Sequence, residues 1–341
     1  MFLVRRLPSR SFVAQRTFST TAITRMSTDK SDAQKNITKW ASTDGHFRRQ
    51  VSSFRDVIEK GGKYEPEKGR YHVFVSYACP WAHRVLITRV LLKLEDVIGL
   101  SVVSPRMGNL GWPFAAADEF PGADSDPIQN SNHMRDLYFK ADPEYSGRFT
   151  VPIVWDKKNS TIVNNESSEI IRFLNTAFRD LAEPVDIDIY PEPLRKEIDD
   201  FHSWVYDTVN NGVYKCGFAT TQEAYESAAG PLFASLDRLE KMIEGKTYFI
   251  GDRLTEADIR LYTTIVRFDP VYHGHFKCNV KSIRHDYPNI NRWMKNLYWN
   301  EPAFKTTTNF EHIKTHYYWS HTQINPTRIV PVGPHPNIES L

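Results

Sequence analysis

What this 341-residue sequence lacks narrows the classes of protein to which it can belong. It has no run of about 18 apolar residues, the length that a membrane-spanning helix needs. Its three cysteines are too few for a disulfide scaffold, which indicates a reducing compartment. The formal net charge of only +2 gives no reason to expect a nucleic acid or another polyanion as partner. The composition is that of a soluble globular protein, and the length predicts about two domains plus an extension.

Acidic side chains are also absent from residues 1–28, although this segment carries five arginines: Arg5, Arg6, Arg10, Arg16 and Arg25. Serine and threonine are frequent there, and the apolar residues could form one side of an amphipathic helix. This pattern is typical of a mitochondrial transit peptide, so we expect a mitochondrial protein. A basic tail without a targeting role is the alternative. Translation from Met26 would give a cytoplasmic form.

Residues 29–69 are polar but contain scattered aromatic residues, among them Trp40, Phe47 and Phe54. Linkers carry fewer aromatic side chains, so the segment is predicted to be an ordered arm wrapped on the core.

Residues 70–182 alternate between β-prone runs and amphipathic segments. The predicted strands are 71–77, 99–104, 149–155 and 162–163, and the predicted helices are 80–94, 131–140 and 167–178. The order βαβαββα is a thioredoxin-like layout, which makes the fold class α/β for this domain.

The chain becomes helical after a proline-rich boundary at 184–193. Residues 190–316 are predicted to form an all-helical domain, with helices at 194–210, 222–244, 256–267 and 290–297. Thr255 and Asp258 are spaced as a capping box at the start of the third of these helices. Residues 317–341 are proline-rich and are predicted to be an extended tail.

Cys79 stands where the first predicted strand gives way to a helix, with Pro80 at the first helical position. Unpaired N–H groups and the helix dipole favour a thiolate at such a place, and Arg84 is nearby, so we expect a lowered pKa. Ala82 replaces a second cysteine, so a mixed disulfide at Cys79 needs an outside thiol to resolve it. The alternative is a buried and inert cysteine.

Val151-Pro152 places a proline at the start of a predicted strand. If the bond is cis, it turns the Val151 backbone outward, where it can pair with a peptide-like ligand. A proline on an edge strand is the alternative.

Glu166 and Ser167 open the last predicted helix of the first domain. Free N–H groups and the Ser167 hydroxyl can bind a carboxylate, and Glu166 can bind an ammonium group. Together they suit the head of an α-amino acid, although an ordinary helix cap is the alternative.

Several other side chains are candidates for a ligand pocket. Trp112 lies in a long loop at 105–130, where it either packs in the core or contacts a ligand. Arg135 can pair with a second carboxylate or be a solvated charge. An aromatic pocket, as opposed to core packing, is a possible role of four tyrosines: Tyr214, Tyr272, Tyr317 and Tyr318.

The order of these features resembles the glutathione transferases over about residues 70–300. Cys79-Pro-Trp-Ala-His-Arg84 is similar to the cysteine-type branch, which is related to the omega class. The C-terminal tyrosines and three further motifs together resemble the xi class, the glutathionyl-hydroquinone reductases. The motifs are Gly111-Trp-Pro-Phe114, Ser146-Gly-Arg148 and Asn164-Asn-Glu-Ser-Ser168.

The resemblance implies a glutathione transferase architecture, glutathione as cosubstrate without a metal, and a homodimer. The implied substrates are aromatic glutathione conjugates, the S-glutathionyl hydroquinones. Cys79 would take the glutathionyl group, and a second glutathione would release it as oxidised glutathione. Tyr214, with Tyr317 or Tyr318, would hold the phenolic oxygens. The implied glutathione-binding residues are Trp112, Arg135, Val151, Glu166 and Ser167.

Two other functions are compatible with the same residues. An omega-like thiol transferase or dehydroascorbate reductase would use Cys79 but would not need the tyrosine pocket. A non-catalytic glutathione-binding scaffold would not need a reactive cysteine.

Overall fold

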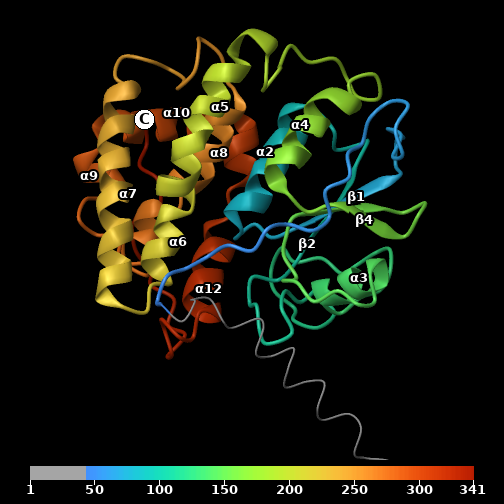
Figure 1. Cartoon of the computed structure of the whole chain (residues 1–341), viewed down its shortest axis with the longest axis horizontal. Coiled ribbons are helices and arrows are strands. Elements are labelled where there is room, and N and C mark those ends of the chain that lie inside the picture. The colour runs from blue at the N-terminus through green and yellow to red at the C-terminus, as the bar shows by residue number, and fades with distance from the viewer. Residues whose placement is uncertain (1–43) are drawn as a thin grey trace, which may run out of the picture.

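The computed structural model describes residues 44–341, which form a small mixed sheet beside a larger group of helices (Figure 1). The predicted fold class is confirmed, because a thioredoxin-like domain is followed by an all-helical domain. The predicted transit peptide at 1–28 and the first part of the arm lie outside the described residues. Within the described chain, no helix combines the length and the apolar character needed to cross a membrane.

The first domain follows the predicted order of strands and helices. Its elements are β1 (Tyr71–Val75), α2 (Pro80–Leu91), β2 (Gly99–Val102), α3 (Met134–Ala141), β3 (Ile153–Asp156), β4 (Thr161–Asn164) and α4 (Ser167–Ala177). The strand order is β2-β1-β3-β4, with β1 parallel to β2 and antiparallel to β3. Every residue of the central strands β1 and β3 is buried, as expected for strands covered on both faces.

The second domain contains more helices than the sequence predicts. Its elements are a short 3-10 helix (Glu192–Leu194), α5 (Arg195–Val205), a π-helical turn (Tyr206–Asn210), α6 (Gly212–Gly217), α7 (Gln222–Met242), α8 (Glu256–Ile265), a second π-helical turn (Phe268–Tyr272), α9 (Ile283–Asp286), α10 (Pro288–Asn300), α11 (Pro302–Thr307) and α12 (Phe310–Ser320). Helices α6, α9, α11 and α12 have no counterpart in the prediction.

The sequence pattern does not predict helix α12, because the buried face of this helix consists largely of polar residue types. The buried side chains include His312, Lys314, His316 and Tyr317, so no apolar period of 3.6 residues appears. The helix continues through Tyr317 to Ser320, and the extended C-terminal segment therefore begins later than the predicted residue 317.

Helix α2 joins the two domains. It packs on β1 and α4 of its own domain and on α8 and α11 of the helical domain. Arg267, which follows α8, donates from Nη2 to the carbonyl oxygen of Tyr77 at 2.8 Å and from Nε to that of Ala78 at 3.0 Å. The helical domain therefore holds the turn that leads into α2.

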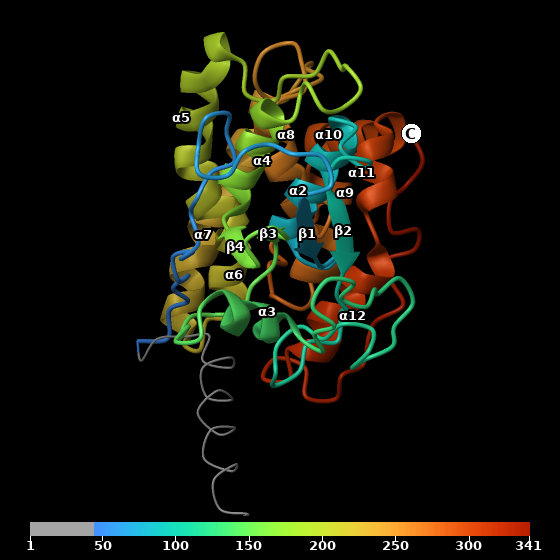
Figure 2. The same cartoon turned by 90° about the vertical axis from the view of Figure 1, so that its right-hand side faces the viewer.

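The loop 105–130 packs against α12 on the side of the molecule seen in Figure 2. Pro105 accepts hydrogen bonds from His316 Nδ1 at 3.0 Å and from Ser320 Oγ at 3.1 Å. These hydrogen bonds attach the long loop of the first domain to α12 of the helical domain.

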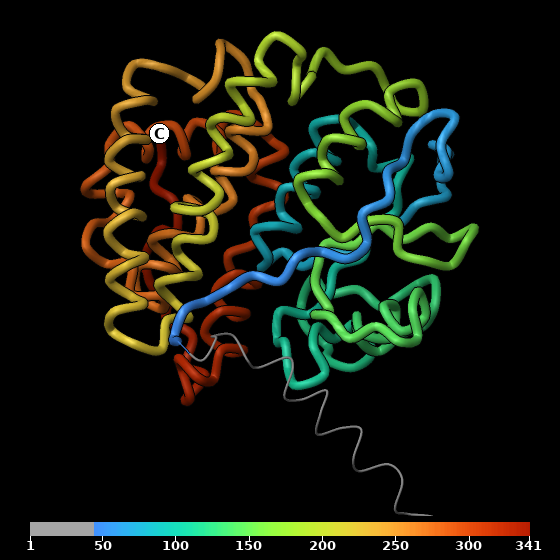
Figure 3. The backbone as a smooth tube through the Cα atoms, in the orientation of Figure 1, coloured from blue at the N-terminus to red at the C-terminus, as the bar shows by residue number. Residues whose placement is uncertain are grey.

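The described part of the arm crosses the front of the molecule from the helical domain to the sheet (Figure 3). At one end, the Thr220 N–H donates to Gly45. At the other, Asn165 donates to Phe54 and Asp56 donates to Val163, so the arm runs alongside β4. Residues 44–69 therefore contact both domains along their length.

Thr255 and Asp258 form the predicted capping box at the start of α8. Between them, the fully buried Glu256 carboxylate contacts Arg172 of α4 at 2.7 Å and Arg260 at 3.3 Å, with His202 of α5 at 3.4 Å. Burial alone would raise the pKa of Glu256, but His202 and Arg172, with the charge of Arg260, lower it to about 2. This ion cluster links the two domains.

Glu256→Gln is expected to lower the free energy of unfolding at pH 7 by about 3–5 kcal/mol, because buried cations lose their counter-charge. The folded pKa of Glu256, about 2, lies below the unfolded value of about 4.3. Its contribution to stability is therefore complete above pH 4.3 and is lost as the pH falls toward 2. Urea unfolding of wild type and variant from pH 7 to pH 3 checks both statements.

The matched control is Asp200→Asn on α5, which removes an exposed carboxylate paired with Lys196. This change should leave stability close to that of the wild type. If Glu256→Gln behaves like the control, the ion cluster does not hold the domains together.

Candidate active site

Cys79 is the residue immediately before α2 and has extended backbone dihedrals, as predicted from the strand-to-helix transition. Its Sγ donates to the Val151 carbonyl oxygen at 3.4 Å and accepts from the backbone N–H groups of Ala82 and Trp81. The helix start therefore points its free donors at the sulfur, which is the arrangement that stabilises a thiolate.

The expected lowering of the Cys79 pKa is wrong for this geometry. Burial raises the pKa of the thiol, because only 8% of the residue is exposed, although the two N–H groups and the charges of Arg267 and Arg49 oppose the rise. Arg84, which was expected to help lower this pKa, is not among the groups that do so. Its guanidinium turns away to Ser167 Oγ at 3.4 Å and packs over Trp81.

The Val151-Pro152 peptide bond is cis, the alternative under which the sequence predicts an outward-facing backbone. Val151 is itself buried, and its carbonyl oxygen meets the Cys79 thiol. Both residues of the pair line the same cavity as Cys79.

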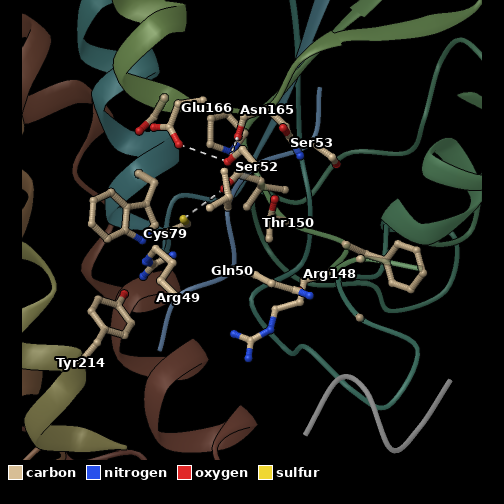
Figure 4. A pocket seen from close by; sticks show the side chains of 18 of the residues that line it. Arg49, Gln50, Ser52, Ser53, Cys79, Arg148, Thr150, Asn165, Glu166 and Tyr214 are labelled. Atoms are coloured by element: carbon tan, nitrogen blue, oxygen red, sulfur yellow. Dashed lines mark hydrogen bonds between the residues drawn. The ribbon is translucent and has the colours of Figure 1, made fainter. Parts of the chain in front are cut away.

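Glu166 caps α4 and accepts from the Ser168 N–H at 3.2 Å. Its second carboxylate oxygen accepts from Ser52 Oγ of the arm at 3.1 Å, as drawn in Figure 4. Ser167 lies beside it, buried at the first position of the helix. The predicted carboxylate- and ammonium-binding groups are therefore neighbours on one wall of the cavity.

The cavity has a volume of about 880 Å³ and is lined by residues of both domains and of the arm. The first domain contributes Cys79, Trp112, Val151, Glu166 and Ser167 among others. The helical domain contributes Tyr206, Tyr214, His316 and Tyr317, and the arm contributes residues 47–53. A space of this size, with a few polar groups converging on a thiol, is suited to a small organic ligand.

Three tyrosine hydroxyls form a hydrogen-bonded network on the helical side. Tyr214 of α6 and Tyr317 of α12 share a hydrogen bond of 2.5 Å, and Tyr272 bonds Tyr317 at 3.0 Å. Burial raises the pKa of each of these phenols, so they remain protonated donors at neutral pH. Tyr318 is not part of this network, because its hydroxyl donates to Pro270 at 3.4 Å and its side chain does not line the cavity.

Of the remaining candidates, Trp112 lines the cavity and Arg135 does not. Trp112 stacks on His316 with ring centres 4.3 Å apart. Arg135 instead packs its guanidinium over Phe139 and Phe149. The arginine that this wall presents to the cavity is Arg148, the last residue of the Ser146-Gly-Arg148 motif, so the sequence signal was present.

Two further cavity residues carry no local sequence signal. Arg49 reaches the cavity from the arm, and His316 reaches it from the helix that the sequence does not predict. The pKa of His316 is lowered to about 4 by burial, so the ring is neutral. Residues 44–341 contain no group of His, Cys, Asp and Glu side chains placed to hold a metal ion.

Two family models match the chain. The glutathione S-transferase N-terminal domain matches residues 78–177, and the glutathione S-transferase C-terminal domain matches residues 222–296. The first range begins just before Cys79 and ends at the last residue of α4.

Similar proteins match over nearly their whole length. The glutathione S-transferase omega-like 2 of Schizosaccharomyces pombe is 57% identical over 89% of this chain and 98% of its own length. The glutathionyl-hydroquinone reductase YqjG of Escherichia coli is 51% identical over 86% of this chain and 90% of its own length.

Solved structures agree with these matches. The xi glutathione S-transferase of Phanerochaete chrysosporium is 64% identical, with a TM-score of 0.89 over 91% of this chain and 99% of its own. The glutathione-bound structure of YqjG is 50% identical, with a TM-score of 0.81 over 84% of this chain and 95% of its own. The chain therefore belongs to the glutathione transferases, in the xi class.

Proposed function

We propose that this protein is a glutathione-dependent reductase that converts S-glutathionyl hydroquinones to hydroquinones through Cys79. The observation that carries the proposal is that one cavity is lined by Cys79 and by Tyr214 and Tyr317, whose hydroxyls share a hydrogen bond; Tyr272 supports Tyr317 from behind the cavity wall. A thiol alone serves any disulfide exchange, whereas buried phenol donors suit a ligand with phenolic oxygens. The name of the Escherichia coli relative supports the same reaction.

Glutathione binding by this chain is supported by the glutathione-bound structure of YqjG and by the groups around Cys79. The Glu166 carboxylate suits the ammonium group of the γ-glutamyl residue, and the start of α4 with Ser167 suits its carboxylate. The Val151 backbone can pair with the cysteinyl part, because it lies against the thiol. Trp112 and Arg148 line the same cavity and can bind the rest of the tripeptide.

The first chemical step joins two sulfur atoms. The Cys79 thiolate attacks the thioether sulfur of the conjugate, so a Cys79–glutathione disulfide forms and the carbon–sulfur bond breaks. The electron pair passes to the ring. If the conjugate reacts as its ketone tautomer, the ring carbon already carries its proton, and the pair ends on the oxygen as a phenolate. The tyrosine hydroxyls can donate to that oxygen and assist the tautomerisation.

The second step needs a thiol from outside the protein. Ala82 stands where a resolving cysteine would be, and neither Cys216 nor Cys278 lines the cavity. A second glutathione thiolate therefore attacks the mixed disulfide, which gives oxidised glutathione and restores Cys79.

The test is turnover of glutathionyl-menadiol by the purified protein with glutathione, followed by chromatography. One menadiol and one oxidised glutathione should form for each conjugate consumed. Glutathionyl-mercaptoethanol disulfide and dehydroascorbate are assayed beside it. Turnover of these two without turnover of the conjugate would make the protein an omega-like thiol transferase, and no turnover of any would favour a binding scaffold.

The homodimer and the mitochondrial location stay predictions. The first is checked by light scattering of the purified protein, and the second by fractionation of cells that express the full chain.

A further inference from the structure

Arg49 of the arm lines the cavity that contains Cys79. Its guanidinium carbon lies 4.3 Å from the ring centre of Trp81 and 5.3 Å from that of Tyr214. Its Nε donates to Asn211 Oδ1 at 2.9 Å, which fixes the plane of the group. Figure 4 shows the side chain between Cys79 and Tyr214. The arm thus places one cation between the thiol and the tyrosines.

The Arg49 guanidinium has hydrogen-bond donors that are not used within the described residues. Within residues 44–341, Arg49 forms no ion pair, and Nε makes its one hydrogen bond. A guanidinium is permanently charged and carries four more N–H groups on its two terminal nitrogens. Stacking between two aromatic rings stabilises the charge but does not use those donors. The two terminal nitrogens are therefore available to an anion that enters the cavity.

The position of Arg49 indicates which anion this is. The γ-glutamyl head has its own binding groups at Glu166 and the start of α4, on the first domain. Arg49 instead touches Trp81, two residues from Cys79, and Tyr214, a member of the hydroxyl network. In the proposed reaction, negative charge leaves the Cys79 thiolate and ends on a phenolic oxygen of the ring. Arg49 lies between these two places.

We propose that Arg49 is a catalytic residue that binds the phenolate oxygen of the departing hydroquinone and so determines which phenols leave efficiently. This inference rests on the proposed function. In the step concerned, the sulfur–sulfur bond forms, the carbon–sulfur bond of the ketone tautomer breaks, and its electron pair becomes the charge on the phenolate. Arg49 stabilises this charge, and the phenolate then takes a proton to give the hydroquinone.

A fixed cation is well suited to this charge because it needs no rearrangement while the bond breaks. The arm keeps Arg49 in place at both ends: Phe47 packs on Phe218 of the helical domain, and Ser52 donates to Glu166. The tyrosines bind the oxygen in its neutral form as well, whereas Arg49 gains most when the oxygen becomes charged. Differential binding of this kind accelerates the chemical step.

The experiment compares Arg49→Gln and Arg49→Lys with wild type on a series of glutathionyl hydroquinones whose phenols differ in acidity, from alkylated to chlorinated rings. For Arg49→Gln, kcat/KM should fall by about 10- to 100-fold on the least acidic phenols and by less on the most acidic. A logarithmic plot against phenol pKa should therefore be steeper than for wild type. Arg49→Lys keeps the charge and should recover part of the loss.

Two controls separate this role from others. Arg55→Gln removes an arginine of the same arm that pairs with Glu169 and does not line the cavity, so it reports on loosening of the arm. Glutathionyl-mercaptoethanol disulfide releases a thiolate and no phenolate. The kcat/KM of Arg49→Gln on this disulfide should therefore fall by no more than about threefold.

An equal loss on every conjugate and on the disulfide would overturn the inference and make Arg49 a structural residue. The charge of Arg49 also lowers the pKa of the Cys79 thiol, so the pH dependence of Cys79 alkylation by iodoacetamide is measured for each variant. If the change in the thiolate fraction accounts for the whole loss on the conjugates, the inference is overturned, because Arg49 would then act only on the thiolate. If the wild type reduces no conjugate at all, the proposed function itself fails, and that result does not depend on Arg49.

Discussion

Cys79→Ser is expected to abolish the reduction of glutathionyl hydroquinones and to leave glutathione binding largely intact. A serine hydroxyl is not ionised near neutral pH and does not form a disulfide, so neither chemical step remains. The groups that suit the γ-glutamyl head, Glu166 and Ser167, are on a different element and keep their partners. Steady-state turnover and calorimetric titration with glutathione measure the two effects separately.

The matched control is Cys278→Ala, which removes another buried cysteine that does not line the cavity. It should bind glutathione and turn over the conjugate like the wild type. If Cys79→Ser retains even a tenth of the wild-type rate, the mixed-disulfide mechanism is wrong.

The position of Cys79 could be predicted from sequence, but its pKa could not. The β-prone run before it and Pro80 after it are local signals, and they place the thiol at a helix start correctly. Its pKa depends on distant parts of the chain, because burial raises the pKa while the charges of Arg267 and Arg49 lower it. Arg267 anchors the preceding turn from the helical domain, and the arm brings Arg49 over the cavity. Sequence reasoning that stays near Cys79 sees neither.

The arginine of the first domain shows a similar limit. Arg135 lies on α3, as predicted for that stretch of sequence, but the helix turns it toward Phe139 and Phe149. Arg148 lies in a loop without periodicity, so its direction depends on how the loop is packed and not on a local pattern. A motif can identify such a residue, whereas a periodicity cannot.

Tyr317 and Tyr318 are adjacent in sequence, and the sequence alone gives no reason to prefer one of them as a cavity residue. Successive residues of an α-helix point about 100° apart, because 3.6 residues make a turn. One of the pair can therefore face the cavity while the other faces elsewhere. In α12, Tyr317 joins the hydroxyl network and Tyr318 donates to Pro270. The sequence shows no apolar period from which this orientation could be predicted.

This difference provides the matched control for the prediction on specificity. Tyr→Phe keeps the aromatic surface and removes only the hydroxyl. Tyr317→Phe and Tyr214→Phe each remove a donor from the network in the cavity. Losing one donor to a developing charge typically costs about 2–4 kcal/mol, or roughly 10²–10³ in rate. At least one of the two changes should lower kcat for glutathionyl-menadiol by that factor, and Tyr318→Phe should not.

The same variants should reduce glutathionyl-mercaptoethanol disulfide within a few-fold of the wild-type rate, because that reaction uses Cys79 and the glutathione-binding groups without a phenolic oxygen. Parallel assays on the two substrates therefore separate the hydroquinone reductase from a thiol transferase. If neither Tyr214→Phe nor Tyr317→Phe separates the two activities, the tyrosines only pack the interior of the helical domain. Cys79 would then act as a general glutathione-dependent thiol transferase. The series of phenols measures the contribution of Arg49 independently of this result.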